Sequence, residues 1–236
     1  MRFEFARESS LHMSMSNRCA IICCELLNFS EYGFNGKRPV APPTRRTVPA
    51  VSVKRSGTRS ARRLFGHCFG GQLLATALGG VVSNIPEPEI GWGECEVEHN
   101  ELACEWFGIT REFLAYQWHF ETFSTPQNAM RILRGANCEN QAFVLGPRIG
   151  LQPHIEVDEH GIKLGAEKDR AMQKKLSGPG AHSYSTILKE MKKKLPAMRA
   201  VTQQVYGVWL ANVRERQMSI TSAVILRSAA TKRFSF

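Results

Sequence analysis

The heptapeptide G-H-C-F-G-G-Q, residues 66–72, contains the residue types needed for covalent catalysis. Its cysteine, Cys68, has the small residues Gly66 and Gly70 two positions before and after it. This pattern is typical of a nucleophile elbow, a sharp strand-to-helix turn that presents one side chain to a substrate. The positive end of the following helix would favour the thiolate, which is the nucleophilic form of cysteine. We therefore expect Cys68 to be a nucleophile; the alternative is a small buried cysteine in a glycine-rich turn.

A cysteine nucleophile needs an imidazole to manage its proton, and the imidazole needs a partner that orients it. Two His-x-Glu pairs offer this combination: His119 with Glu121, and His154 with Glu156. On a strand, residues two apart project from the same face, so either carboxylate could orient its histidine. Two such pairs are unsurprising in a chain with seven histidines, and the spacing alone does not choose between them.

The order of these residues resembles that of the class I glutamine amidotransferases. In that family a G-x-C-x-G-x-Q elbow precedes a late Q-F-H-x-E motif, and here Cys68 precedes His154 by about 85 residues. The resemblance covers about residues 64–216 and is closest to the stand-alone members related to the amidotransferase domain of GMP synthase. The supporting segments are Q-L-L-A-T-A-L-G-G (72–80), E-I-G-W-G-E (89–94), Q-W-H-F-E-T-F (117–123), N-Q-A-F (140–143) and G-L-Q-P-H-I-E-V (150–157).

This resemblance implies an α/β protein with a partial flavodoxin-like fold, in which helices flank a mixed sheet. It also implies hydrolysis of the glutamine side-chain amide to glutamate and ammonia through a Cys-His-Glu triad. Cys68 would attack the amide carbon, His154 would move the proton and Glu156 would orient His154. Glutamine would be the small-molecule substrate, with a synthetase or other nitrogen acceptor of unknown identity as a possible partner. The thiol mechanism implies no metal and no organic cofactor.

The resemblance further implies a set of substrate-binding residues near the elbow. Gln72 matches the family glutamine that helps to hold the substrate. Phe69 and Gly70 follow the nucleophile, and the backbone N–H of Phe69 would be an oxyanion donor that stabilises charge on the carbonyl oxygen. His119 falls in the segment that lines the glutamine pocket; the alternative is a packing role between its aromatic neighbours.

The sequence also departs from the family pattern before the elbow. Family members have a Gly-Gly-Pro-like loop about 30 residues before the cysteine, which supplies the second oxyanion donor, whereas the corresponding region here is basic, rich in proline and unmatched. Pro153 stands where the family has phenylalanine, beside the expected base. These departures support an alternative function: a truncated, catalytically inactive remnant that acts as an interaction module.

Charge and cysteine content restrict the remaining function classes. The net charge of +10 divides into +8 for residues 1–65, −9 for residues 66–160 and +11 for residues 161–236. Any polyanion binding would depend on the basic flanks alone, and nucleic acid is a disfavoured partner because these flanks lack interleaved aromatic residues. No apolar run is long enough to cross a membrane. The seven cysteines are an odd number without a C-x-x-C pair, which favours a reducing cytoplasm.

The composition predicts three segments along the chain. Residues 1–63 are expected to be a disordered leader rich in proline and arginine, residues 64–217 an amidotransferase-like domain, and residues 218–236 a C-terminal tail. Apolar runs at 93–97, 113–118, 130–133 and 141–145 predict short strands. Helical periodicity predicts two amphipathic helices, at about 185–195 and 197–216, separated by Pro196.

Overall fold

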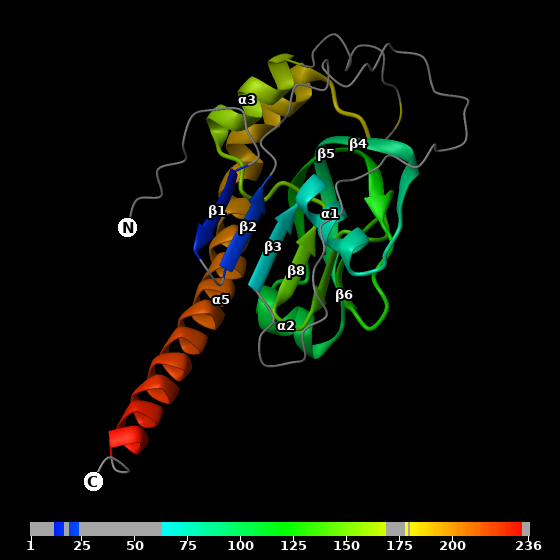
Figure 1. The fold of residues 1–236 in the computed structure, drawn as a ribbon. Helices are drawn as coiled ribbons and strands as arrows, with labels where there is room; N and C mark the ends of the chain where they lie inside the picture. The colour runs from blue at the N-terminus through cyan, green and yellow to red at the C-terminus, as the bar shows by residue number, and fades with distance from the viewer. Residues whose placement is uncertain (1–11, 17–18, 24–62, 169–177, 179, 233–236) are drawn as a thin grey trace.

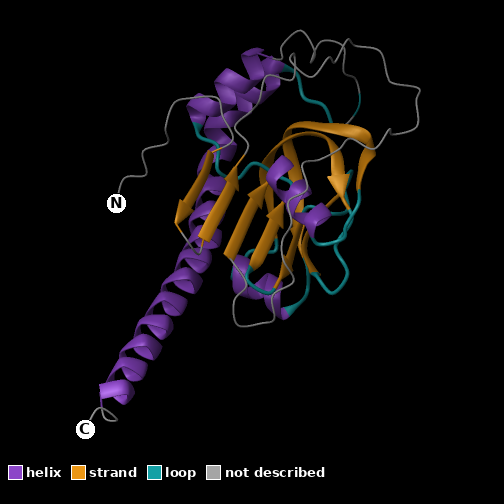
Figure 2. Ribbon diagram, viewed as in Figure 1, coloured by secondary structure: helices purple, strands orange, loops and turns teal. Residues whose placement is uncertain are grey.

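The computed structural model describes residues 12–16, 19–23, 63–168, 178 and 180–232 (Figure 1). These residues form one sheet with helices on both sides (Figure 2). The strands are β1 His12–Ser16, β2 Cys19–Cys23, β3 Arg63–His67, β4 Val82–Val97, β5 Glu112–Phe123, β6 Met130–Gly135, β7 Ala142–Leu145 and β8 Arg148–Leu151. The helices are α1 Phe69–Ala77, α2 Glu101–Phe107, α3 Glu159–Lys168 and α5 Tyr184–Lys232.

The sheet is mixed, with the strand order β1-β2-β3-β8-β7-β6-β4-β5. Strands β2, β3 and β8 are parallel to one another, and all other neighbours are antiparallel. The α/β class and the mixed sheet predicted from the sequence are therefore confirmed. The four predicted strands correspond to β4–β7, although β4 and β5 extend well beyond the predicted runs.

Alternating side chains of the central strands pack on opposite faces of the sheet. Leu64 of β3 lies in a cluster with Leu74 of α1, whereas the next residue, Phe65, lies in the main core on the other face. That main core includes side chains of α2, α3 and α5. Because successive side chains of a strand point to opposite faces, β3 is covered by α1 on one side and by α5 on the other. His67, two residues after Phe65, is directed toward α5.

Helix α5 continues through Pro196. The predicted break between two helices is therefore wrong. Proline removes a backbone donor and costs about 3 kcal/mol inside a helix. Burial of one large apolar side chain contributes about 1.5–3 kcal/mol, and α5 buries a whole stripe of such side chains at helical spacing, so packing outweighs the cost. The stripe consists of Ile187, Met191, Leu195, Met198, Val201, Val205 and Trp209.

The boundaries predicted at 63–64 and 217–218 can be compared with the described helices and strands. Strands β1 and β2 lie within the predicted leader of residues 1–63, and β2 pairs with β3 in parallel. The other residues up to 62 lie outside the described residues. The boundary predicted at 217–218 falls inside α5, which runs to Lys232 and extends past the sheet (Figure 1). Within the described part of the chain, no helix combines the length and the hydropathy needed to span a membrane.

Candidate functional site

Cys68 lies at a sharp turn between β3 and α1, as predicted. Its backbone has φ 46° and ψ −111°, in the left-handed half of φ that costs a non-glycine residue about 1–3 kcal/mol. Its N–H donates to the carbonyl of Leu151 at 2.7 Å, and its carbonyl accepts the N–H of Gln72 at 2.9 Å. These two bonds hold the turn between strand β8 and the first turn of α1. The residue is 9% exposed.

Two glycines let α1 approach the strands beneath it. A Cβ at Gly66 would lie 2.5 Å from the carbonyl oxygen of Gly70, and a Cβ at Gly71 would lie 2.5 Å from the carbonyl oxygen of Leu151. Both distances are far below a van der Waals contact. The Leu151 carbonyl is also the acceptor for the Cys68 N–H, so the space left by Gly71 allows the contact that fixes the turn at Cys68.

We expect Gly71→Ala to lower the free energy of unfolding by about 1–3 kcal/mol, the usual cost of overpacking a core. The methyl group would push α1 away from β8 and displace Cys68 with it. Urea denaturation measures the effect. Gly207→Ala is the matched control: Gly207 is exposed on α5 with no atom near its Cβ position, so this change should raise stability by roughly 0.5–1 kcal/mol. Equal effects of the two substitutions would contradict the packing argument.

The parallel pairing of β3 with β8 brings His154 toward Cys68. Residue His67, at the end of β3, is paired with Leu151, at the end of β8. The carboxyl ends of parallel strands meet at one edge of a sheet, which is where α/β proteins place their sites. His154 follows β8 by three residues, and its N–H donates to the carbonyl of Tyr116 on β5 at 2.8 Å. Cys68 and His154, which are far apart in the sequence, therefore lie close together in the fold.

His154 and Glu156 form a close pair. The distance between His154 Nδ1 and Glu156 Oε1 is 2.6 Å, and the two side chains are 4% and 9% exposed. Burial by itself would lower the pKa of His154, but the Glu156 carboxylate and then the Cys68 thiol, which is near enough to hydrogen-bond, raise that pKa well above its ordinary value. The geometry therefore favours a charged imidazole between a carboxylate and a sulfur.

Glu156 has a second imidazole beside its other oxygen. His67 Nδ1 lies 3.2 Å from Glu156 Oε2, and His67 Nε2 lies 2.8 Å from the hydroxyl of Tyr206 on α5. Burial by itself would raise the pKa of Glu156, yet the neighbouring His67 and His154 lower it to about 2. The carboxylate therefore stays ionised at neutral pH.

Gln72 lies beside Cys68, to which Gln152 connects it. Its Nε2 donates to the carbonyl of Glu121 at 2.9 Å and lies 3.3 Å from Gln152 Oε1. The Nε2 atom of Gln152 in turn lies 3.6 Å from Cys68 Sγ. Phe69 is 39% exposed at the start of α1, and Gly70 beneath it is buried. Because the first N–H groups of a helix have no partner within the helix, this end of α1 is suited to hold an oxyanion.

No model of a known protein family matches the sequence. The chain is 33% identical over 113 residues to the glutamine-hydrolysing GMP synthase subunit of Sulfurisphaera tokodaii, a match that covers 45% of this chain and 58% of that protein. The structure is similar to a glutamine amido transferase from Methylobacillus flagellatus, with a TM-score of 0.59, 35% identity and coverage of 65% of this chain and 63% of that one.

The chain is therefore similar to glutamine amidotransferases in both sequence and structure. A glutamine amidotransferase from Thermotoga maritima is also similar, with a TM-score of 0.54 and 28% identity, covering 63% of this chain and 62% of that one. The resemblance predicted from the sequence is thereby confirmed. The chain spans less than two thirds of the length of each of these relatives.

His119 is buried in a polar cluster that adjoins Gln72. His119 Nε2 lies 2.8 Å from the carboxylate of Glu89, which is its cross-strand partner on β4. Its Nδ1 lies 3.1 Å from the backbone carbonyl of Glu121, the same oxygen that accepts from Gln72. The carboxylate that pairs with His119 is therefore that of Glu89, not that of Glu121 in the His-x-Glu pair.

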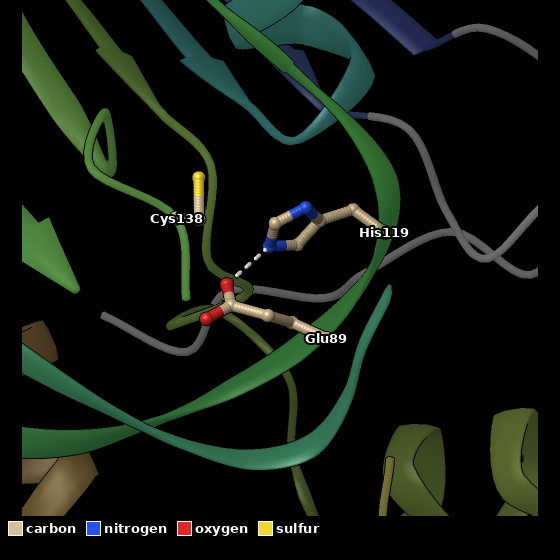
Figure 3. Close-up of side chains that lie close together, drawn as sticks. All are labelled: Glu89, His119 and Cys138. Atoms are coloured by element: carbon tan, nitrogen blue, oxygen red, sulfur yellow. Dashed lines mark ion pairs between the residues drawn. The ribbon is translucent and has the colours of Figure 1, made fainter. Parts of the chain in front are cut away.

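Glu89, His119 and Cys138 could together offer three ligand atoms to a metal ion, since these atoms lie within 4.8 Å of one another (Figure 3). The three side chains already contact other groups of the protein. Glu89 Oε2 accepts from Gln141 Nε2 at 2.7 Å as well as facing His119, and Cys138 Sγ donates to the carbonyl of Asn140 at 3.7 Å. Burial raises the pKa of Cys138 to about 11, so the thiol keeps its proton at neutral pH. Each of the three side chains therefore already has a polar contact within the protein.

Three residues of the site were missed by sequence reasoning. His67 directly precedes Cys68, and Gln152 precedes His154 by two residues. Both could have been predicted from their positions next to those residues at the ends of two strands. Glu89 carried no signal, because its pairing with His119 depends on the register of β4 against β5.

Proposed function

We propose that this chain hydrolyses the side-chain amide of glutamine to glutamate and ammonia, with Cys68 as nucleophile, His154 as acid and base, and Glu156 as the group that orients His154. The observation that carries the proposal is the pair at 2.6 Å between His154 and Glu156, beside a cysteine in an elbow turn. The similarity to two glutamine amidotransferases and to a glutamine-hydrolysing subunit supports the choice of substrate.

The reaction would proceed through a glutamyl thioester. Cys68 Sγ, as the thiolate, forms a bond to the amide carbon, and the carbonyl oxygen becomes an oxyanion held by the N–H groups at the start of α1, that of Phe69 among them. His154, protonated, gives its proton to the amide nitrogen, the carbon–nitrogen bond breaks and ammonia leaves. Water then attacks the thioester with His154 as base, which returns the thiolate and releases glutamate.

Gln72 and His119 have different places in this proposal. Gln72 lies beside Cys68 and would hold the substrate, as the family resemblance implies. His119 contacts the same Glu121 carbonyl that accepts from Gln72, so we assign it a supporting role behind Gln72. By likeness to the GMP synthase subunit, we propose further that a separate synthetase is the acceptor of the ammonia; a cytoplasmic location stays a prediction.

The test is the release of ammonia and glutamate by the purified full chain, together with mass spectrometry after treatment with an electrophilic glutamine analogue. We expect ammonia release with glutamine and not with asparagine, and one adduct on the peptide that contains Cys68. Absence of both ammonia and adduct would overturn the proposal. An adduct formed by iodoacetamide alone, without turnover, would favour the alternative of an inactive, amidotransferase-like interaction module.

A further inference from the structure

We propose that His67 is a positioning residue that holds Glu156 in the orientation needed by His154, and that Tyr206 of α5 fixes the His67 ring. This inference rests on the proposed function, because it assigns a role within the same site. His67 directly precedes the nucleophile in the sequence, but its side chain is fully buried on the α5 face of the sheet. The side chain therefore contacts the site from behind and does not face the substrate side with Cys68.

The partners of His67 indicate which of its nitrogens carries the proton. Nδ1 lies 3.2 Å from the Glu156 carboxylate, and the backbone of Pro153 is a second acceptor beside the ring, so both neighbours favour a proton on that nitrogen. Nε2 then accepts a hydrogen bond from the Tyr206 hydroxyl, at 2.8 Å. Burial is the main reason that the pKa of His67 is lowered from its ordinary value, so the ring is neutral at neutral pH. A neutral imidazole packed against Oε2 can limit the rotation of the carboxylate without competing with His154 for its charge.

Tyr206 is held in place by an aromatic stack. Its ring lies on Phe65, with centroids 5.1 Å apart and planes inclined by 17°. Phe65 precedes His67 by two residues on β3 and lies on the same face, so one strand supplies both the ring that holds Tyr206 and the imidazole that Tyr206 contacts. The chain of contacts therefore runs from α5 through Tyr206 and His67 to Glu156.

The consequence is that the two oxygens of Glu156 have separate tasks. Oε1 is 2.6 Å from His154, and Oε2 lies beside His67. If the contact at Oε2 is lost, the carboxylate can rotate about its last bond and its alignment with His154 is weakened. Misplacement of a catalytic group by about 1 Å can cost about 100-fold in rate. We expect this cost to fall on kcat, because His67 lies away from the substrate.

The substitutions His67→Asn and His67→Gln distinguish the contact of Nδ1 with Glu156 from the contact of Nε2 with Tyr206. The amide nitrogen of asparagine can take the place of Nδ1, whereas the longer glutamine places its amide where Nε2 was. We expect His67→Gln to lower kcat of glutamine hydrolysis by about 10- to 100-fold with little change in KM, and His67→Asn to keep kcat within about threefold. Tyr206→Phe, which keeps the stacked ring, should lower kcat by a smaller factor. His160→Gln, on the exposed face of α3, is the control.

A second measurement does not depend on turnover. In the full chain with ¹⁵N-labelled histidine, NMR titration follows His154, which is faced by Glu156, Cys68 and, beyond Glu156, His67. We expect the pKa of His154 to fall in His67→Gln, because a rotated Glu156 stabilises its charge less, and to be retained in His67→Asn. This result would support the inference even if the wild-type chain proved unable to hydrolyse glutamine.

Two outcomes would overturn the inference. One is that the glutamine and asparagine variants lose activity equally while the titration of His154 is unchanged, which would make His67 a packing residue. The other is that both retain the wild-type rate and titration. If His67→Gln does not fold, the Tyr206→Phe variant decides, since an unchanged kcat and an unchanged His154 titration there would exclude the proposed path from α5.

Discussion

Cys68→Ala is expected to lower the rate of ammonia release from glutamine by at least about 1,000-fold. Removal of a catalytic nucleophile eliminates the covalent route, and the residual rate reflects only binding and the oxyanion donors. The folded state should be preserved, because alanine has a similar backbone requirement and the two contacts that Cys68 Sγ makes outside the His154 pair are long, at 3.6 Å to Gln152 and 3.9 Å to the Trp118 carbonyl. The measurement is a coupled assay for ammonia or glutamate at saturating glutamine.

The matched control for this experiment is Cys104→Ala, which removes an exposed free thiol on α2. It should leave the rate and the thermal stability unchanged. A Cys68→Ala variant with the wild-type rate would show that glutamine hydrolysis, if observed, does not use this sulfur.

Glu156→Gln is expected to reduce kcat by about 1,000- to 10,000-fold, which is the size of the effect when the carboxylate that orients a catalytic histidine becomes an amide. The same change should lower the free energy of unfolding by about 3 kcal/mol at neutral pH, because it removes one partner of a buried charged pair. Enzyme assays and urea denaturation measure the two effects. Glu159→Gln, at the exposed start of α3, serves as the control.

The stability difference between wild type and Glu156→Gln should depend on pH. The pKa of Glu156 is lowered from 4.5 to about 2 in the folded state, although burial alone would raise it, because His67 and His154 stabilise its charge. A carboxylate with a depressed pKa contributes stability above its unfolded pKa and loses that contribution as pH falls. The difference should therefore shrink as the pH falls from about 4.5 toward 2. A constant difference across this range would show that Glu156 is not stabilised as an anion.

The contribution of His154 to stability has the opposite dependence on pH and is lost in the alkaline range. Its pKa is raised well above 6.5, against the effect of burial, by Glu156 and Cys68. A group with a raised pKa contributes stability that is complete below its unfolded pKa and is lost as pH rises through the folded value. Wild-type stability should thus decline above neutrality more steeply than that of Glu156→Gln, in which the amide no longer favours the imidazolium.

The elbow and the order of the site residues could be predicted from the sequence because they depend on local rules. Glycines around Cys68 mark a turn with crowded backbone, and the order of Cys68 and His154 along the chain matches a known family. Strands β4 to β7 could be predicted from apolar runs, because such runs are also a local property of the sequence. The path of α5 through Pro196 was not predictable in this way, since the local cost of proline is outweighed by a stripe of side chains buried on the sheet.

The neighbours of the site residues were decided by the tertiary structure alone. The amino-acid sequence by itself determined which side chains could carry the proposed chemistry and where the chain turns, since turns and strand periodicity follow from backbone sterics over a few residues. It did not indicate that Glu156 lies between two imidazoles, because His67 comes from a distant part of the chain and reaches Glu156 only through the pairing of β3 with β8. Nor did it indicate the contact of His67 with Tyr206, which is 139 residues away on α5. The same holds for Glu89 and His119, which face each other through strand register. Such contacts depend on sheet order and on helix packing, which are set by burial summed over the whole core and not by any single motif.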